Sequence, residues 1–225
     1  MIPLKDDIPT QTFPFITIML ITANVLVFLR ELMLPPPVRE EFISQLAVIP
    51  YAMTHPGPGH PGFLVYNALT LLTSMFLHGG IMHLVGNMLY LWIFGNNIED
   101  VMGHARFLLF YFLCGLAGAL TQIAASPASR IPMIGASGAI AGVLGAYLVM
   151  FPAARVLTLV FLFFFVRVVP IPALIVLGAW LLIQLVNAGQ IAPGGVAWFA
   201  HIGGFLTGLV AIVPFRRRRY RQSLY

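Results

Sequence analysis

Six long apolar segments constrain what this chain can fold into more than any other feature of its sequence. A helix needs roughly 20 residues to cross the hydrocarbon core of a bilayer, and each segment is close to that length. Only 8% of the 225 residues are charged, whereas soluble domains average about 25%, so lipid must cover much of the folded surface. We therefore expect an all-α membrane protein with spans at residues 13–33, 80–96, 106–125, 135–151, 171–187 and 196–215.

The connections predict a single membrane domain, residues 1–225, with both ends on the cytoplasmic side. It has a short N-terminal segment at 1–12, a six-helix core at 13–215 and a basic tail at 216–225. Five of the twelve lysines and arginines lie in this tail, and basic residues beside a membrane helix favour the cytoplasmic face. We expect the tail to fix orientation rather than to bind nucleic acid, and an even number of spans then places both termini inside.

Two stretches between the spans do not fit a simple turn. Residues 31–77 are proline-rich and long, so we expect an outer loop between the first two helices that is irregular or partly helical. Residues 156–166 are apolar but too short to cross, and their β-branched and aromatic side chains favour extended structure. Three alternatives stay open for this stretch: the start of a long helix, a re-entrant segment or an interfacial hairpin. A seventh span there would place the basic tail outside.

Carboxylates are missing from the interiors of the predicted spans, because all seven acidic residues lie outside them. This excludes a paired-aspartate protease and a carboxylate proton relay, and the lack of an HExxH motif excludes the usual zinc protease. Polar groups that remain inside a membrane are costly and usually functional, and here they are His83, Asn87, Ser137 and His201. The other polar side chains within the spans are amides of the kind that bonds across helices: Asn24, Gln122 and Gln184.

The four candidate residues are predicted to lie at one depth. The second, fourth and sixth spans all enter from the outer side, and each candidate follows soon after the start of its span. At about 1.5 Å per residue, all four fall within roughly 3–11 Å of the outer helix ends. Asn87 follows His83 by four residues, so the two share one helix face. We therefore expect one shallow pocket that opens outward.

These residue types favour nucleophilic chemistry in that pocket. Ser137 stands in Gly135-Ala136-Ser137-Gly138, and His201 is a suitable base for its proton. With no carboxylate available in the bundle, we expect a dyad. A serine at a helix N-terminus offers its own backbone N–H to an oxyanion, and His83 and Asn87 can add side-chain donors.

Glycines at a spacing of four are expected to bring the serine and histidine helices together. The pairs are Gly138-x-x-x-Gly142 and Gly204-x-x-x-Gly208. Small residues at this spacing let two membrane helices approach closely.

The order of the motifs resembles the rhomboid family of intramembrane serine proteases. The motifs are Leu-Leu-Thr-Ser-Met-Phe-Leu-His at 71–78, His83-x-x-x-Asn87, Gly-Ala-Ser-Gly at 135–138 and Ala-His-Ile-Gly-Gly at 200–204. The segment at 96–100, followed by Gly103-His104, is also similar to that family. The resemblance covers roughly residues 66–215, and the ordered set is far more specific than any one motif.

The resemblance implies a role for each motif residue. Ser137 is expected to be the nucleophile and His201 the general base, with no metal and no cofactor. The oxyanion is expected to be held by His83, Asn87 and the backbone of Ala136 and Ser137. Four further residues are expected to support the site without taking part in the chemistry: His78, Gly135, Gly138 and Gly204.

The resemblance further implies the substrate and the compartment. Substrates are expected to be transmembrane segments of other proteins, cut near the outer membrane face. The fifth helix and the loop at 188–195 are expected to act as gate and cap. Six helices match the basic bacterial form of the family, which implies an inner-membrane protein with cytoplasmic termini.

Two positions depart from the family pattern. Many members carry a Trp-Arg pair in the first loop, where this chain has Leu69-Thr70. Some members stack an aromatic ring on the catalytic histidine from four residues after the serine. Ala141 occupies that position here, so His201 must be oriented in another way.

Two other classes of function compete with a protease. One is a rhomboid-like protein that binds transmembrane helices without cutting them, which the intact Ser137 and His201 disfavour. The other is a small transporter or metal-binding protein that uses His78, His83 and His201 as ligands. That reading leaves the serine between glycines unexplained.

Overall fold

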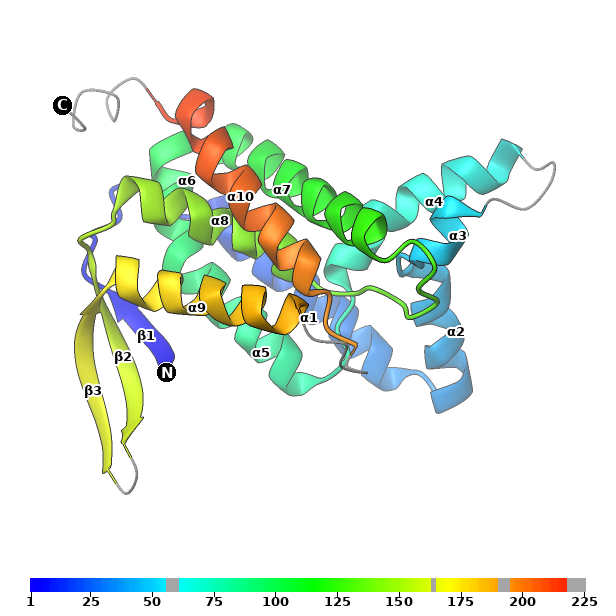
Figure 1. Ribbon diagram of the computed structural model, residues 1–225, viewed down its shortest axis with the longest axis horizontal. Helices are drawn as coiled ribbons and strands as arrows, with labels where there is room; N and C mark the ends of the chain where they lie inside the picture. The colour runs from blue at the N-terminus through cyan, green and yellow to red at the C-terminus, as the bar shows by residue number, and fades with distance from the viewer. Residues whose placement is uncertain (56–60, 163–164, 190–194, 218–225) are drawn as a thin grey trace.

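The computed structural model describes residues 1–55, 61–162, 165–189 and 195–217, and these residues are mostly helical (Figure 1). The longer helices pack side by side as a bundle, with shorter helices at one end and a small sheet at the other. In chain order the bundle helices are α1 (Phe15–Met33), α5 (Ile81–Tyr90), α7 (His104–Ala125), α8 (Ser137–Met150), α9 (Ala173–Ala188) and α10 (Trp198–Phe215).

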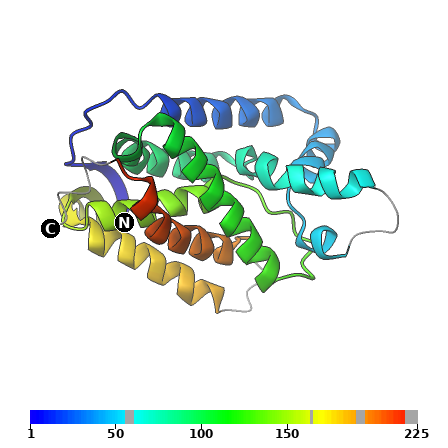
Figure 2. The same cartoon turned by 90° about the horizontal axis from the view of Figure 1, so that it is seen from above.

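Helix α8 lies at the centre of the bundle and packs against α7 and α10 (Figure 2). Most of its residues are buried, as expected for a helix that is apolar on every face. A side chain at Gly145 would collide with the carbonyl of Phe205, and one at Gly208 would collide with the carbonyl of Gly142. The glycines therefore let the backbones of α8 and α10 touch, as the spacing predicted for Gly142 and Gly208 but not for Gly145.

Three of the described helices, α1, α7 and α10, are long and apolar enough to cross a membrane alone. A fourth span results if the bent pair Val65–Phe76 and Ile81–Met102 counts as one, with 83° between its halves. Helices α8 and α9 are apolar but shorter. The prediction of a mostly helical membrane protein is confirmed, and the number of six spans stays a prediction.

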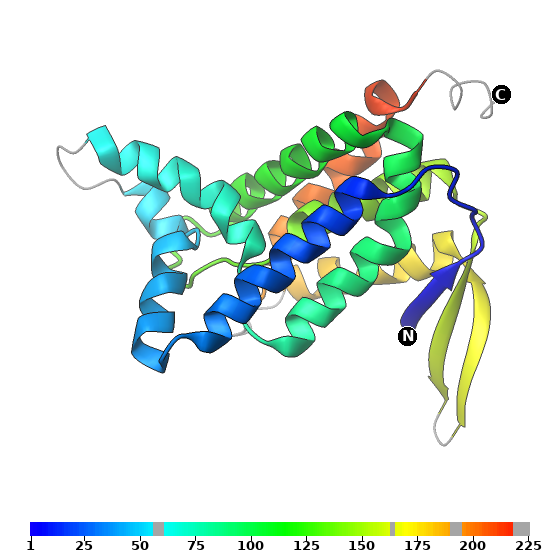
Figure 3. The same ribbon diagram turned by 180° about the vertical axis from the view of Figure 1, so that it is seen from behind.

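The connection between α1 and α5 is largely helical in its described part. It contains α2 (Pro36–Leu46), α3 (Pro50–Thr54), α4 (Pro61–Thr73) and the 3₁₀ turn η1 (Ser74–Phe76). Prolines stand in the first turns of α2 and α3, where a fixed φ suits the helix and a missing N–H costs nothing. The expectation was an irregular or partly helical connection, and its described prolines begin helices, which lie at the end of the molecule opposite the sheet (Figure 3).

The prediction of an all-α chain is wrong for three segments, which form an antiparallel sheet in the order β1-β2-β3. The strands are β1 (Ile2–Asp6), β2 (Arg155–Leu162) and β3 (Phe165–Pro172). Extended structure was the expectation for residues 156–166, and it is confirmed for the described ones. Branched and aromatic side chains favour this conformation, and β1 adds a partner from the far end of the sequence.

Buried carboxylates connect the N-terminal region to the bundle at the sheet end. Pro14 precedes α1 and supplies no side-chain cap, so the first N–H groups of that helix need outside acceptors. Glu99, on α6 (Asn96–Met102), accepts from the N–H groups of Ile16 and Thr17 at 2.9 and 2.8 Å. Helix α6 continues α5 through the π-helical turn η2 (Leu91–Gly95).

Asp6 makes a second connection of this kind between β1 and the bundle. The hydroxyl of Tyr147 on α8 donates to the Asp6 carboxylate at 2.6 Å. Burial raises the pKa of Asp6, although the hydrogen bond from Tyr147 acts in the opposite direction.

Strand β1 and the C-terminal end of α10 lie at the same end of the bundle (Figures 1 and 3).

Candidate active site

Ser137 is the first residue of α8, and Gly135 shapes the turn that leads into it. Gly135 has a φ of 116°, a conformation that glycine adopts far more readily than residues with a side chain. Its N–H donates to the carbonyl of Ser74 at 2.9 Å. A Cβ at Gly135 would lie 2.8 Å from Nε2 of His83. Glycine therefore sets the entry to α8 and leaves open the space beside the His83 imidazole.

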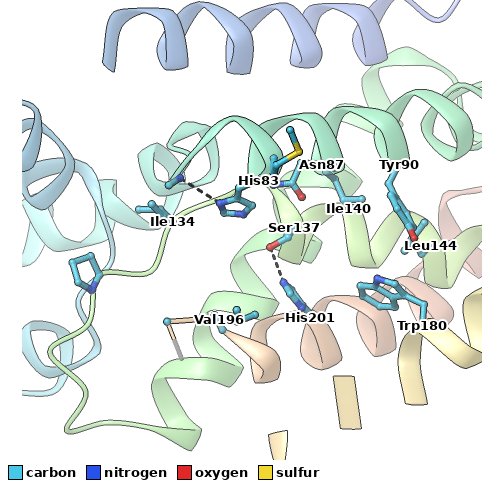
Figure 4. Close-up of a pocket in the computed structure, with 16 residues that line it drawn as sticks. His83, Asn87, Tyr90, Ile134, Ser137, Ile140, Leu144, Trp180, Val196 and His201 are labelled. Atoms are coloured by element: carbon cyan, nitrogen blue, oxygen red, sulfur yellow. Dashed lines mark hydrogen bonds between the residues drawn. The ribbon is translucent and has the colours of Figure 1, made fainter. Parts of the chain in front are cut away.

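His201 lies in the first turn of α10, and its Nε2 is 2.8 Å from Oγ of Ser137 (Figure 4). The two helices come close at this level because a side chain at Gly204 would collide with the carbonyl of Gly138. The structure thus places the serine and the histidine singled out from the sequence within hydrogen-bond distance. Gly138 and Gly204 lie at the helix contact that supports this pair.

Two residues of α9 contact the other side of the His201 ring, and the sequence did not indicate either contact. Oε1 of Gln184 is 2.8 Å from Nδ1 of His201. The ring of Trp180 lies 5.8 Å from the imidazole, centroid to centroid, at an interplanar angle of 38°. Trp180 therefore supplies the aromatic neighbour that Ala141 cannot. The four-residue spacing of Trp180 and Gln184 places them on one face of α9, but does not say what that face contacts.

His83 and Asn87 project from α5 toward Ser137, as Figure 4 shows. The backbone N–H of Gly79 donates to Nδ1 of His83 at 3.3 Å, which leaves Nε2 of that ring directed at the space beside Gly135. Nδ2 of Asn87 would lie 3.6 Å from a Cβ at Gly135. The two α5 side chains therefore border the same small space in front of the serine.

His78 supports this arrangement from the turn before α5. Its Nε2 is 3.0 Å from Nδ2 of Asn87, and its backbone N–H donates to the carboxylate of Glu31 at 3.3 Å. Burial lowers the pKa of His78 to about 4, so the imidazole is neutral near pH 7 and Nε2 can accept from the Asn87 amide. His78 therefore holds Asn87, and it does not line the cavity that contains Ser137.

A cavity of about 530 Å³ contains all four candidate residues. Its polar end holds His83, Asn87, Ser137 and His201, and Figure 4 shows these side chains directed toward one another. The rest of its wall is mainly apolar and comes from α5, α8, Trp180 of α9 and the segments before α8 and α10, with Tyr90, Ile140, Leu144 and Val196 among the lining residues. An apolar cavity with a few convergent polar groups is typical of a binding or catalytic site.

Comparison with known proteins places the chain in a family. The model of the Rhomboid domain matches residues 66–218. The chain belongs to the rhomboid family. This finding confirms the resemblance drawn from the motifs and agrees with an integral membrane protein that has apolar helices.

Three rhomboid relatives show the extent of the similarity. Rhomboid protein 1, mitochondrial, of Saccharomyces cerevisiae is 32% identical over 175 residues, which are 71% of this chain and 47% of the relative. Rhomboid protease GluP of Bacillus subtilis is 34% identical over 142 residues, 63% of this chain and 25% of the relative. RHOMBOID-like protein 4 of Arabidopsis thaliana is 37% identical over 151 residues, 67% of this chain and 35% of the relative. The chain therefore spans less than half of the length of each of these relatives.

Proposed function

We propose that this rhomboid protein is an intramembrane serine endopeptidase with a Ser-His dyad. Ser137 is the nucleophile and His201 is the general base. The observation that carries the proposal is the 2.8 Å distance from Oγ of Ser137 to Nε2 of His201 at the polar end of an otherwise apolar cavity. A hydroxyl with a base at this distance is the arrangement that nucleophilic catalysis requires.

The reaction follows from these two groups. Oγ of Ser137 attacks the carbonyl carbon of the peptide bond while its proton moves to Nε2 of His201. The tetrahedral intermediate collapses, the C–N bond breaks, and His201 gives the proton to the departing amine. Water then attacks the acyl-enzyme by the same route in reverse, which releases the new carboxylate and restores the serine.

The negative oxygen formed in this reaction occupies the space beside Gly135. His83 and Asn87 border that space, and each can direct an N–H at the oxygen. The backbone N–H groups of Ala136 and Ser137 are further donors, since the first N–H groups of a helix have no partner within it. Fixed donors of this kind stabilise the transition state because they need no reorganisation as the charge develops.

The substrate is a transmembrane segment of another membrane protein, cut near the outer face. The cavity lies between α5 and α9 (Figure 4) and its wall is mostly apolar, which suits a segment that arrives from lipid. Helix α9 acts as the gate. Residues 190–194 of the loop assigned as the cap lie outside the described residues.

We further propose that residues 1–225 form a single membrane domain with six spans. It lies in a bacterial inner membrane, with both termini on the cytoplasmic side. Helices α8 and α9 count as spans because they are apolar, although they are short. The end of α10 and strand β1 lie at one end of the bundle, which supports termini on one side. Most of the basic tail, residues 218–225, lies outside the described residues.

Cleavage of a transmembrane reporter in lipid vesicles tests the proposal. We expect the purified chain to cut the reporter within or next to its apolar segment. Ser137→Ala and His201→Ala should each abolish cleavage while leaving the thermal unfolding transition intact. Binding of the reporter without any cleavage would favour a rhomboid-like protein that only binds helices. Cleavage that survives Ser137→Ala and stops when metal is chelated would favour metal chemistry instead.

A further inference from the structure

His201 makes a second hydrogen bond that the proposed chemistry does not use. Its Nε2 is directed at Ser137, while its Nδ1 is 2.8 Å from Oε1 of Gln184. Gln184 belongs to α9, and only 4% of its surface is exposed. An amide buried this deeply would lose free energy if either of its ends lacked a partner.

The orientation of the Gln184 amide follows from its other end. Nε2 of Gln184 lies 2.8 Å from the backbone carbonyl of Trp180, one turn earlier in α9. A carbonyl oxygen can only accept, so the NH₂ end of the amide must face Trp180. The oxygen end of the amide then faces His201.

The protonation of the imidazole follows in turn. The amide oxygen of Gln184 can only accept, so Nδ1 of His201 must carry the proton that is shared with it. In a neutral imidazole Nε2 is then unprotonated, and it accepts from the hydroxyl of Ser137. This tautomer is the one that a general base for Ser137 needs, whereas the other would direct N–H at the hydroxyl and could not take its proton.

We infer that Gln184 is a positioning residue for the general base, an inference that rests on the proposed function. Its side-chain oxygen holds His201 in the Nδ1–H tautomer, and it keeps that bond as the ring becomes charged. In a serine protease triad a carboxylate does this work, and here a neutral amide occupies the equivalent position relative to the ring. Because the bond joins α9 to α10, the geometry of the base depends on how these two helices pack.

Trp180 supports the same arrangement. Its carbonyl fixes the Gln184 amide, and its ring packs against both His201 and Phe205, with centroids 5.8 and 6.0 Å away. One turn of α9 therefore restrains the imidazole both in its plane, through Gln184, and on its face, through Trp180. This explains how His201 is held in a chain that has Ala141 in place of a stacking ring.

The test compares Gln184→Met with a matched variant of the same helix. Methionine has similar length and volume but offers only a weak acceptor. The matched variant is Asn187→Leu, since the side chain of Asn187 also donates to a carbonyl one turn earlier, that of Ile183, at 2.7 Å. Within the described residues Asn187 makes no hydrogen bond to His201. Both variants are assayed on the vesicle reporter after their unfolding transitions are measured.

We expect Gln184→Met to lower kcat by about 10- to 100-fold with little change in KM, because the base is misplaced while the substrate cavity is kept. Asn187→Leu should stay within about twofold of the unmodified chain. Gln184→Glu restores an acceptor for Nδ1 of His201 but loses the donor to the carbonyl of Trp180, so it should recover part of the lost kcat. A kcat for Gln184→Met that equals that of Asn187→Leu would overturn the inference.

A spectroscopic measurement on the unmodified chain keeps the inference testable even if Gln184→Met fails to fold. The ¹⁵N resonances of the His201 ring, assigned by their loss in His201→Ala, should show a protonated Nδ1 and an unprotonated Nε2 at neutral pH. A protonated Nε2 would overturn the inference. Failure of the proposed function is a separate result, because the unmodified chain would then not cleave the reporter, or Ser137→Ala would still cleave it, whatever happens at Gln184.

Discussion

Replacing Glu99 by glutamine should destabilise the fold by about 1.3–4 kcal/mol, through the start of α1. One carboxylate oxygen accepts from the N–H and the hydroxyl of Thr17 at 2.8 and 2.7 Å, and the other accepts from the N–H of Ile16 at 2.9 Å. Glutamine has only one oxygen, so at least one buried donor loses its acceptor, at a cost of about 1–3 kcal/mol. Loss of negative charge beside the helix N-terminus adds about 0.3–1 kcal/mol.

Reversible unfolding in detergent micelles measures this loss, and Glu41→Gln is the matched control. Glu41 lies on the exposed surface of α2, and its carboxylate accepts a hydrogen bond from the exposed side chain of Gln45. We expect the control to stay within about 0.5 kcal/mol of the unmodified chain. The fraction of Glu99→Gln that stays folded should still cleave the reporter, because Glu99 is not among the residues that line the cavity. Equal stability of Glu99→Gln and Glu41→Gln would refute the reasoning.

Three further outcomes test other parts of the account. Asn87→Ala should lower kcat about 100-fold with little change in KM, and unchanged kcat would remove Asn87 from the oxyanion site. Gly135→Ala should destabilise the fold by about 1–3 kcal/mol, because Gly135 has a positive φ and a Cβ there would clash with His83. Gly178→Ala is the control, since a Cβ at Gly178 meets nothing within 4 Å, and equal losses of stability in the two variants would contradict the prediction. Burial raises the pKa of Asp6 above 3.8, so its contribution to stability is present below pH 3.8 and lost as pH rises through the native pKa. The stability of Asp6→Asn relative to the unmodified chain should therefore grow as pH rises from 3.8 to the native pKa and stay constant above it, and a difference that is independent of pH would contradict the sign.

The sequence was informative about the site because membrane burial makes polar residues rare. Ser137 and His201 stand out against apolar surroundings, and helix geometry places them at one depth without any knowledge of the tertiary packing. His83 and Asn87 follow from the same argument, with the four-residue spacing as a second signal. The structure brings these side chains to one cavity, and their chemical roles stay proposals.

The contacts of α9 could not be predicted in the same way. Helix α9 is apolar on nearly every face, so periodicity does not show which face turns toward the bundle. Gln184 was expected to bond across helices, but its partner is set by the rotation of α9 about its own axis. The ring of Trp180 reaches His201 for the same reason.

Long-range pairing explains the other differences. Branched and aromatic side chains favoured extended structure for β2, but nothing local indicated that residues 2–6 form its partner β1, which lies about 150 residues away in the chain. Glu99 is likewise 83 residues from Ile16, whose N–H it accepts. Contacts of this kind depend on the completed bundle, so the local sequence carries little signal for them.

Covalent labelling of Ser137 tests the central claim most directly. The chain is treated in detergent with a fluorophosphonate, which reacts with activated serine hydroxyls, and the modified residue is located by peptide mass mapping. We expect a single adduct on Ser137, and a loss of that adduct in His201→Ala while the fold is kept. An adduct on another serine, or a rate of labelling at Ser137 that His201→Ala leaves unchanged, would contradict the dyad.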